Sequence, residues 1–153
     1  MSDRRNRTEV GKIGEDTACK YLEKHGFTIV ERNYWKKWGE IDIIATKAGL
    51  SFGGDNSSDS FAPVLHFIEV KAITRSRGRS TSPGIGGGTT NPDYEPEENV
   101  HSWKLKRLSR AIQTYLIERK INNEREWQVD VITVELDFET RNAKMKILED
   151  IGL

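Results

Sequence analysis

Cysteine, long apolar runs and net charge are scarce or missing in this sequence, and each absence excludes a class of protein. A single cysteine, Cys19, rules out a framework of internal disulfides, and no Cys/His cluster has the spacing of a structural zinc site. No apolar run approaches the roughly 18 residues of a membrane span, and the charged N-terminus lacks the apolar stretch of a signal peptide. These absences predict a cytoplasmic protein in a reducing compartment, with no membrane partner.

The net charge is zero although the chain of 153 residues is rich in charge, because 24 Lys and Arg residues balance 24 Asp and Glu residues. The balance argues against a highly basic, tail-like nucleic-acid binder, although it says nothing about local patches. The length predicts a single domain over residues 1–153 with one hydrophobic core.

Two segments, residues 47–63 and 74–99, differ from the rest in composition. They hold eight of the thirteen glycines and all four prolines, and the second has only Ile85 and Tyr94 as sizeable apolar side chains. Such a segment buries too little apolar surface to offset the entropy lost on ordering it. We therefore predict two long flexible loops, of the kind that in compact domains is either functional or disordered.

The remaining residues alternate between helical and strand periodicity. Apolar side chains recur every three or four positions in two segments, which predicts helices, and β-branched runs predict strands between and after them. The predicted order is α-β-β-β-α-β-β, in which helices can cover both faces of a sheet, so the fold class is an α/β sandwich. The predicted helices are residues 8–25 and 103–119, and the predicted strands are residues 27–32, 39–46, 65–73, 127–136 and 144–148.

Charged residues interrupt two of the apolar strands with matching alternation. Because side chains alternate between the faces of a strand, Asp42, Glu69 and Lys71 emerge on one face if both apolar sets join one core layer. The two strands suggest an antiparallel hairpin, and a register that pairs Thr46 with Leu65 places Asp42 opposite Glu69. The expected apolar sets on the other face are Ile41, Ile43 and Ala45 in the first strand and Ile68, Val70 and Ala72 in the second.

The opposition of two carboxylates predicts a cation site. Asp42 and Glu69 would repel each other across the ladder, and a divalent cation between them would remove that cost. Carboxylate oxygens are hard ligands that suit Mg²⁺ or Mn²⁺. Lys71 could then orient water beside the cation or stabilise negative charge on a phosphoryl transition state. Glu15 borders the apolar stripe of the first helix, where it could add a ligand or form only a rim salt bridge.

Several motifs occur in the order found in a known family. The sequence resembles the YraN family of uncharacterised bacterial proteins, which are similar to the Holliday-junction-resolvase-like branch of the restriction-endonuclease-like fold. The resemblance covers most of the predicted core. Its motifs are GKIGEDTACKYL at Gly11–Leu22, Arg32-Asn33, GEIDIIA at Gly39–Ala45, FIEVK at Phe67–Lys71 and KLKRLSRAIQTY at Lys104–Tyr115.

The resemblance implies a three-layer α/β sandwich whose central mixed sheet has about five strands flanked by helices. It also implies a metal-dependent nuclease site of the PD-(D/E)xK type, with Glu15, Asp42, Glu69 and Lys71 as catalytic residues. Asp42, Glu69 and the backbone carbonyl of Val70 would bind Mg²⁺ or Mn²⁺. The sequence departs from that branch because no proline precedes Asp42, and its two long loops resemble insertions relative to the compact family pattern.

Basic residues near the expected site predict a nucleic-acid partner, with DNA favoured over RNA, and a homodimer also fits the resemblance. Positive charges follow Lys71 and recur along the second helix, where they could neutralise phosphates. A solvated helix face explains the same helix pattern. The predicted contacts are Arg75, Arg77, Lys106, Arg107, Arg110 and Gln113. The aromatic and basic residues 34–38 (YWKKW) could stack on unpaired bases or pack as a turn on the core.

Two other functions remain open at the level of the sequence. The domain could bind nucleic acid without cutting it, with carboxylates that hold a structural metal or have lost their role. It could instead bind a protein through its long loops, with no affinity for nucleic acid. We predict structural roles for His25, His66 and His101, and a hydrogen-bonding role for Asp130.

Overall fold

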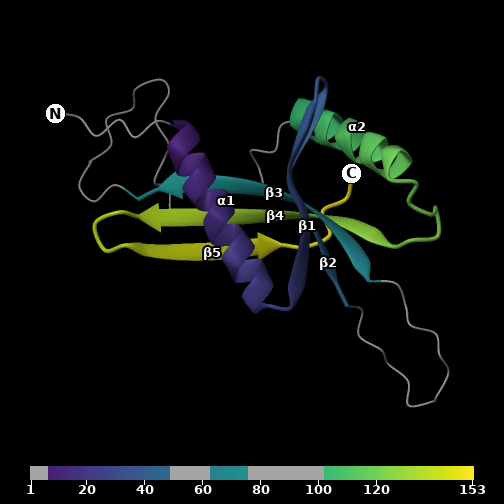
Figure 1. Ribbon diagram of the computed structural model, residues 1–153. Helices are drawn as coiled ribbons and strands as arrows, with labels where there is room; N and C mark the ends of the chain where they lie inside the picture. Colours follow the sequence, from purple (N-terminus) through teal and green to yellow (C-terminus); the bar gives the residue numbers. More distant parts are fainter. Residues whose placement is uncertain (1–6, 49–62, 76–101) are drawn as a thin grey trace, which may run out of the picture.

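The computed structural model describes residues 7–48, 63–75 and 102–153, which form two helices and five strands in the predicted order (Figure 1). The segments predicted as loops lie almost entirely outside the described residues. The elements are α1 (Arg7–Lys24), β1 (Phe27–Lys36), β2 (Gly39–Lys47), β3 (Val64–Thr74), α2 (Ser102–Glu118), β4 (Trp127–Asp137) and β5 (Asn142–Leu148). No helix among these is long and apolar enough to cross a membrane.

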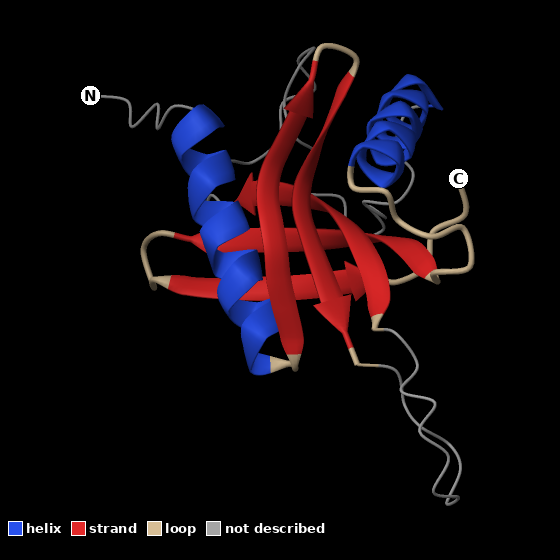
Figure 2. Cartoon of the chain, turned by 45° about the vertical axis from the view of Figure 1, so that its right-hand side comes forward, coloured by secondary structure: helices blue, strands red, loops and turns tan. Residues whose placement is uncertain are grey.

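The five strands form one mixed sheet in the order β1-β2-β3-β4-β5. Only β3 and β4 run parallel, and α2 is the crossover between them; the other neighbours are antiparallel. The predicted hairpin register is confirmed, because Thr46 pairs with Leu65 and Ile43 with Ile68. Figure 2 shows α1 and α2 on opposite faces of the sheet. The fold is therefore the expected three-layer α/β sandwich.

Each helix buries one apolar stripe against its own face of the sheet, because a sheet between two helices must be apolar on both sides. The alternation along the strands divides the side chains between the two layers. The α1 layer contains Ala18, Leu22, Phe27, Ile43, Ala45, Ile68, Ile132 and Val134. The α2 layer contains Tyr34, Ile41, Ile44, Phe67, Leu108, Ile112, Tyr115 and Val129.

The β1–β2 hairpin differs from its prediction in length and direction. Strand β1 was predicted to end at Arg32; instead it continues to Lys36, with Asn33 at a φ of 52°. Pairing of β2 with β3 stops at Ile43, whereas pairing with β1 continues to Gly39, so the tip of the hairpin projects past the sheet beside α2 (Figure 2). The prediction for Ile41 was wrong, since this side chain follows the twisted tip into the α2 layer.

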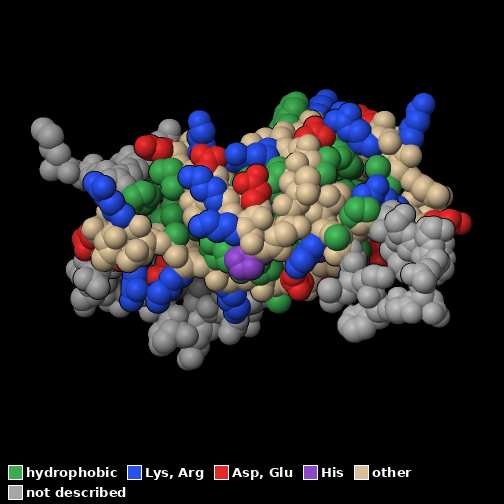
Figure 3. All heavy atoms as spheres, turned by 60° about the horizontal axis from the view of Figure 1, so that its bottom comes forward, with side chains coloured by type: hydrophobic (Ala, Val, Ile, Leu, Met, Phe, Trp, Pro, Cys, Tyr) green, Lys and Arg blue, Asp and Glu red, His purple; other side chains and the backbone are tan. Residues whose placement is uncertain are grey.

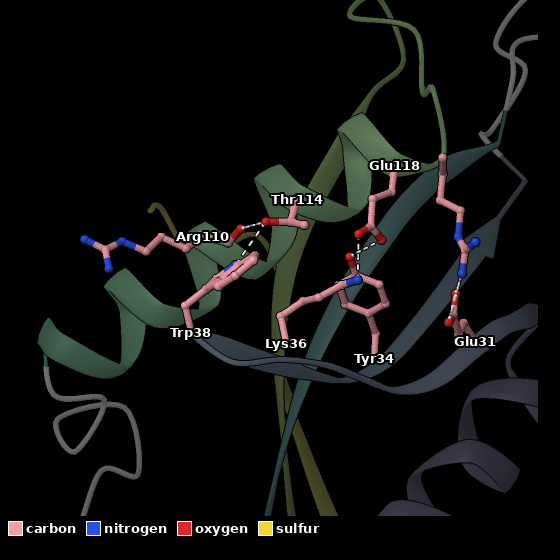
Figure 4. A network of polar contacts seen from close by, with 8 residues as sticks. Glu31, Tyr34, Lys36, Trp38, Arg110, Thr114 and Glu118 are labelled. Atoms are coloured by element: carbon pink, nitrogen blue, oxygen red, sulfur yellow. Dashed lines mark hydrogen bonds and ion pairs between the residues drawn. The ribbon is translucent and has the colours of Figure 1, made fainter.

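The projecting tip is fastened to α2. Gly39 permits the approach, because a Cβ there would lie 2.3 Å from the main-chain oxygen of Arg107. Side-chain hydrogen bonds then run along the contact, as Figure 4 shows. They are Trp38 Nε1 to Thr114 Oγ1 (3.0 Å), Tyr34 Oη to Glu118 Oε2 (2.7 Å), Lys36 Nζ to Glu118 Oε1 (2.6 Å) and Arg119 to Glu31 Oε2 (2.9 Å).

Candidate functional site

The site begins where β2 and β3 separate. Beyond the Ile43–Ile68 pair, the main-chain ladder ends, and the N–H of Val70 donates to Asp42 Oδ2 at 2.7 Å. A side chain thus replaces the main-chain partner that a continued ladder would supply. The N–H and C=O of one strand residue point to the same side, so the Val70 carbonyl also faces the gap beside Asp42.

The two strand carboxylates resist ionisation. Burial, and next the charge of Glu69, raise the pKa of Asp42 to about 8. The hydrogen bond from the Val70 N–H lowers this pKa, and the charges of Glu15 and Glu40 add smaller increases. Burial also raises the pKa of Glu69, although Lys104 and Lys71 work in the opposite direction. Desolvation and like charge are the conditions that a cation relieves. The ladder ends one pair before Asp42 and Glu69 would stand opposite each other, but the charge of Glu69 still raises the pKa of Asp42.

A small cavity of about 140 Å³ opens between β3 and α2. Glu69 and Lys71 both line it, as strand alternation requires. Lys104 also lines the cavity, and its Nζ lies 3.6 Å from Glu69 Oε1. The remaining lining residues are Glu40, Leu105, Arg107, Leu108, Val131 and Ile151.

The sequence did not predict Lys104 as a site residue. Its sole signal was its position at the start of the KLKRLSRAIQTY motif, which carries no chemistry without the placement of α2 over β3. The ion pair with Glu69 supplies positive charge next to a carboxylate that burial would otherwise neutralise. Lys104 therefore belongs to the charge balance of the cavity.

Glu15 lies on α1 next to the point where the helix makes a close contact with β3. A Cβ on Gly14 would lie 2.5 Å from the Cβ of Ala72, so the glycine lets α1 approach β3 and brings the next residue over the sheet. Glu15 Oε2 lies 3.7 Å from Arg32, and the charge of Glu15 also raises the pKa of Asp42. Glu15 thus forms the rim ion pair with Arg32 and also raises the pKa of Asp42.

The donor set can be compared with the needs of a divalent cation. In the described parts of the chain, no three His, Cys, Asp or Glu side chains form a group that could hold a metal ion. The possible ligands where β2 and β3 separate are the carboxylates of Asp42 and Glu69 and the carbonyl of Val70. Mg²⁺ is commonly bound through one or two carboxylates, with water and substrate phosphate as the other ligands. The residues present therefore fit Mg²⁺ or Mn²⁺.

The predicted nucleic-acid contacts fall into two places. Lys106, Arg110 and Gln113 lie exposed on α2, near the hairpin tip, and Arg107 Nε donates to the carbonyl of Trp38 at 3.3 Å. Arg75 lies apart, at the end of β3, 3.6 Å from Glu135 Oε1. Positive and negative side chains are interspersed over the face drawn in Figure 3. Arg77 and His101 lie outside the described residues.

The structure separates the aromatic residues of the hairpin tip. Tyr34 is buried in the α2 layer, whereas Trp35 and Trp38 are 68% and 42% exposed. Neither tryptophan is therefore buried in the core, as the packing alternative required, and the buried aromatic residue of this segment is Tyr34. His66 and Asp130 form a buried pair, with Nδ1 and Oδ2 2.6 Å apart, which agrees with the structural and hydrogen-bonding roles predicted for them.

Asp42→Asn is expected to stabilise the protein at high pH. The pKa of Asp42 is raised from 3.8 to about 8, so the native state binds the extra proton between these values and loses stability as pH rises through that window. Asparagine keeps an oxygen for the Val70 N–H and removes the charge. Urea unfolding should show equal stability near pH 4 and an advantage of about 1–3 kcal/mol for the variant at pH 8.5.

The exposed acid Glu139 offers a matched control, because Glu139→Gln should leave stability unchanged at both pH values. Addition of Mn²⁺ at pH 8 should raise the melting temperature of the wild-type protein and not that of Asp42→Asn. A stability difference between wild type and Asp42→Asn that is the same at pH 4 and pH 8.5 would contradict the coupling.

Comparisons with known proteins find relatives over most of the chain. The model of the family described as "Uncharacterised protein family UPF0102" matches residues 14–134. A UPF0102 protein of Campylobacter concisus (strain 13826) is 34% identical over 143 residues, 94% of this chain and 93% of that protein. A UPF0102 protein of Helicobacter hepaticus (strain ATCC 51449 / 3B1) is 33% identical over 148 residues, 97% of this chain and 98% of that protein. The chain therefore belongs to the UPF0102 family, which is the YraN family of the sequence motifs.

Proposed function

We propose that this protein is a metal-dependent phosphodiesterase of the PD-(D/E)xK type that cuts nucleic acid, with DNA as the expected substrate. One observation carries the proposal: two coupled, half-buried carboxylates, Asp42 and Glu69, lie where β2 and β3 separate, and Lys71 follows on the same face. Titratable groups shifted by burial and a specific partner are characteristic of functional sites.

Each residue has a role that its position allows. Asp42, Glu69 and the Val70 carbonyl would hold the cation. When bound, Mg²⁺ supplies positive charge for the phosphoryl group and favours ionisation of water. Lys71, beside Glu69 in the cavity, would orient the attacking water and stabilise negative charge as the phosphate is cut. Glu15 would add negative charge from α1, where it already raises the pKa of Asp42 without forming a group of three carboxylates.

The basic residues would contact the substrate away from the acids. Lys106, Arg107, Arg110 and Gln113 lie on one stretch of α2 that adjoins the cavity, and Arg75 lies at the end of β3. Their charges would neutralise phosphates on either side of the cut position. An overall charge of zero is compatible with this arrangement, because a bound cation would neutralise the negative charge of the site carboxylates.

The proposal is tested by incubating the protein with end-labelled junction, flap, single-stranded and duplex DNA, and with matched RNA, in Mg²⁺, Mn²⁺ or EDTA. We expect cleavage of at least one DNA substrate that requires the divalent ion and is lost in Asp42→Ala, with Glu139→Gln as the matched control. Cleavage that persists in Asp42→Ala, or no cleavage of any substrate by protein shown to bind Mn²⁺, would overturn the proposal.

A second candidate is a nucleic-acid-binding module that does not cut. The observation that favours it is the ion pair between Lys104 and Glu69, which already supplies a positive charge where a metal ligand is expected. This candidate predicts salt-sensitive binding that does not require a divalent ion. Nitrocellulose filter binding in EDTA, followed by the cleavage assay, separates the two functions.

A further inference from the structure

The indole of Trp38 is held firmly and yet remains open to solvent. Its Nε1 donates to Thr114 Oγ1 at 3.0 Å (Figure 4). Its main-chain oxygen accepts from Arg107 Nε at 3.3 Å. Thr114 Oγ1 in turn donates to the carbonyl of Arg110. Even so, 42% of the residue is exposed. A large aromatic surface fixed in one orientation without being buried has the character of a recognition element.

A hollow lies beside this indole on the surface of α2. Its volume is about 420 Å³, and it is lined by Trp38, Ser109, Arg110, Gln113 and Thr114. Figure 4 shows Arg110 extending from α2 away from the indole, so its guanidinium remains available at the surface. Among the residues that the structure describes, no carboxylate pairs with Lys37, Lys106 or Arg110. Arg110 therefore gives the hollow a positive charge that no carboxylate of the described residues neutralises.

This hollow is connected to the acid cavity by a row of shared residues. The acid cavity shares Leu105 with a second hollow, lined by Leu105, Lys106, Ser109, Arg110 and Leu153, and that hollow shares Ser109 and Arg110 with the Trp38 hollow. Between Lys104 and Thr114 the helix rises about 15 Å. That length corresponds to about four or five nucleotides of a stacked strand.

We infer that Trp38, with Arg110 and Gln113, forms a subsite that stacks on an unpaired base of a nucleic acid strand whose phosphates pass along α2 to the acid cavity. The inference rests on the proposed function for the class of partner and adds the substrate class, a nucleic acid with a single-stranded segment. An aromatic ring stacks on any unpaired base, whereas bases within a duplex cover one another. The Gln113 amide can hydrogen-bond to a base edge.

Binding without cleavage tests the inference. Fluorescence anisotropy in EDTA at low salt is measured with a labelled 12-nucleotide single strand, the matching duplex and a labelled poly-glutamate peptide. We expect Trp38→Ala to weaken single-strand binding about tenfold or more and duplex binding less than about threefold. Trp38→Phe keeps a ring and should retain most of the affinity.

Two further variants keep the test decisive if Trp38→Ala folds poorly. Trp35 is the matched control, because it lies in the same hairpin, is 68% exposed and alternates to the opposite face from Tyr34 and Lys36; Trp35→Ala should bind as wild type does. Arg110→Gln changes an exposed side chain and should weaken single-strand binding, with a salt dependence shallower by about one phosphate contact.

Several outcomes would overturn the inference. They are equal losses for single strand and duplex in Trp38→Ala, equal losses in Trp35→Ala and Trp38→Ala, or poly-glutamate bound as tightly as the single strand. If wild-type protein binds and cuts DNA while Trp38→Ala is unaffected, the subsite fails and the proposed function stands. If wild-type protein binds no nucleic acid at low salt, both fail together.

Discussion

Lys71→Met is expected to lower the single-turnover rate of cleavage at least about 100-fold at saturating Mg²⁺, without loss of the fold. Lys71 follows Glu69 on the same strand face and lines the same cavity, so its ammonium is the β3 cation placed to act beside the acids. Groups that position a proton or stabilise transition-state charge typically contribute two to four orders of magnitude. Methionine preserves the aliphatic length of the side chain and removes its charge.

The measurement also has to separate chemistry from binding. Because substrate binding would rest mainly on the α2 surface, we expect the affinity for single-stranded DNA in EDTA to change less than about threefold in Lys71→Met. Lys144→Met, an exposed change on β5, is the matched control and should cut at the wild-type rate. A Lys71→Met protein that cuts within tenfold of wild type would remove Lys71 from the proposed mechanism.

Local patterns were sufficient to predict most of the fold. The β2–β3 register follows from a single pairing, Thr46 with Leu65, and the rest of that ladder is then fixed by the two-residue period of strands. The helices were predictable because each has one apolar stripe to bury. The length of β1 was not, because asparagine is uncommon in strands, yet Asn33 is accommodated inside β1 in a left-handed conformation.

Some residues of the candidate site could be predicted from local patterns, whereas others depend on tertiary packing. Glu69 and Lys71 share a face because alternation is local, and that prediction needed no knowledge of the tertiary fold. Lys104 could not be predicted, since its contact with Glu69 depends on how α2 packs after a long connecting segment. The prediction for Ile41 was wrong for a related reason. The hairpin tip, which precedes Ile43 in the sequence, is not paired with β3 and turns toward α2.

Asp130→Ala is expected to lower the free energy of unfolding by about 3–5 kcal/mol at pH 7. Asp130 and His66 are only 2% and 5% exposed. The carboxylate accepts hydrogen bonds from His66 Nδ1 at 2.6 Å, from Gln128 Nε2 at 2.8 Å and from the N–H of Asp150 at 2.9 Å. Its removal leaves a buried imidazole without its acceptor and releases the segment after β5 from β4.

The pH dependence of this loss has a definite sign. Burial by itself would raise the pKa of Asp130, but the hydrogen bonds from His66, the Asp150 N–H and Gln128 hold it below the ordinary 3.8. The ionised group therefore stabilises the native state fully above pH 3.8, and this contribution is lost as pH falls through the lowered pKa. Urea unfolding at pH 7 and pH 3 should show the gap between wild type and Asp130→Ala narrowing at the lower pH.

The same variant separates a structural histidine–aspartate pair from a catalytic one. Asp130 pairs with Ile68, one residue before Glu69, yet it lies on the α1 face of the sheet, whereas Glu69 and Lys71 line the cavity under α2. We therefore expect Asp130→Ala to cut at nearly the wild-type rate well below its lowered melting temperature. Glu135 is half-exposed on the same strand, and Glu135→Gln should lower the free energy of unfolding by less than about 0.5 kcal/mol. Lost cleavage in a stable Asp130→Ala protein would instead place the pair in the chemistry, because the α1 face would then communicate with the acids through β3.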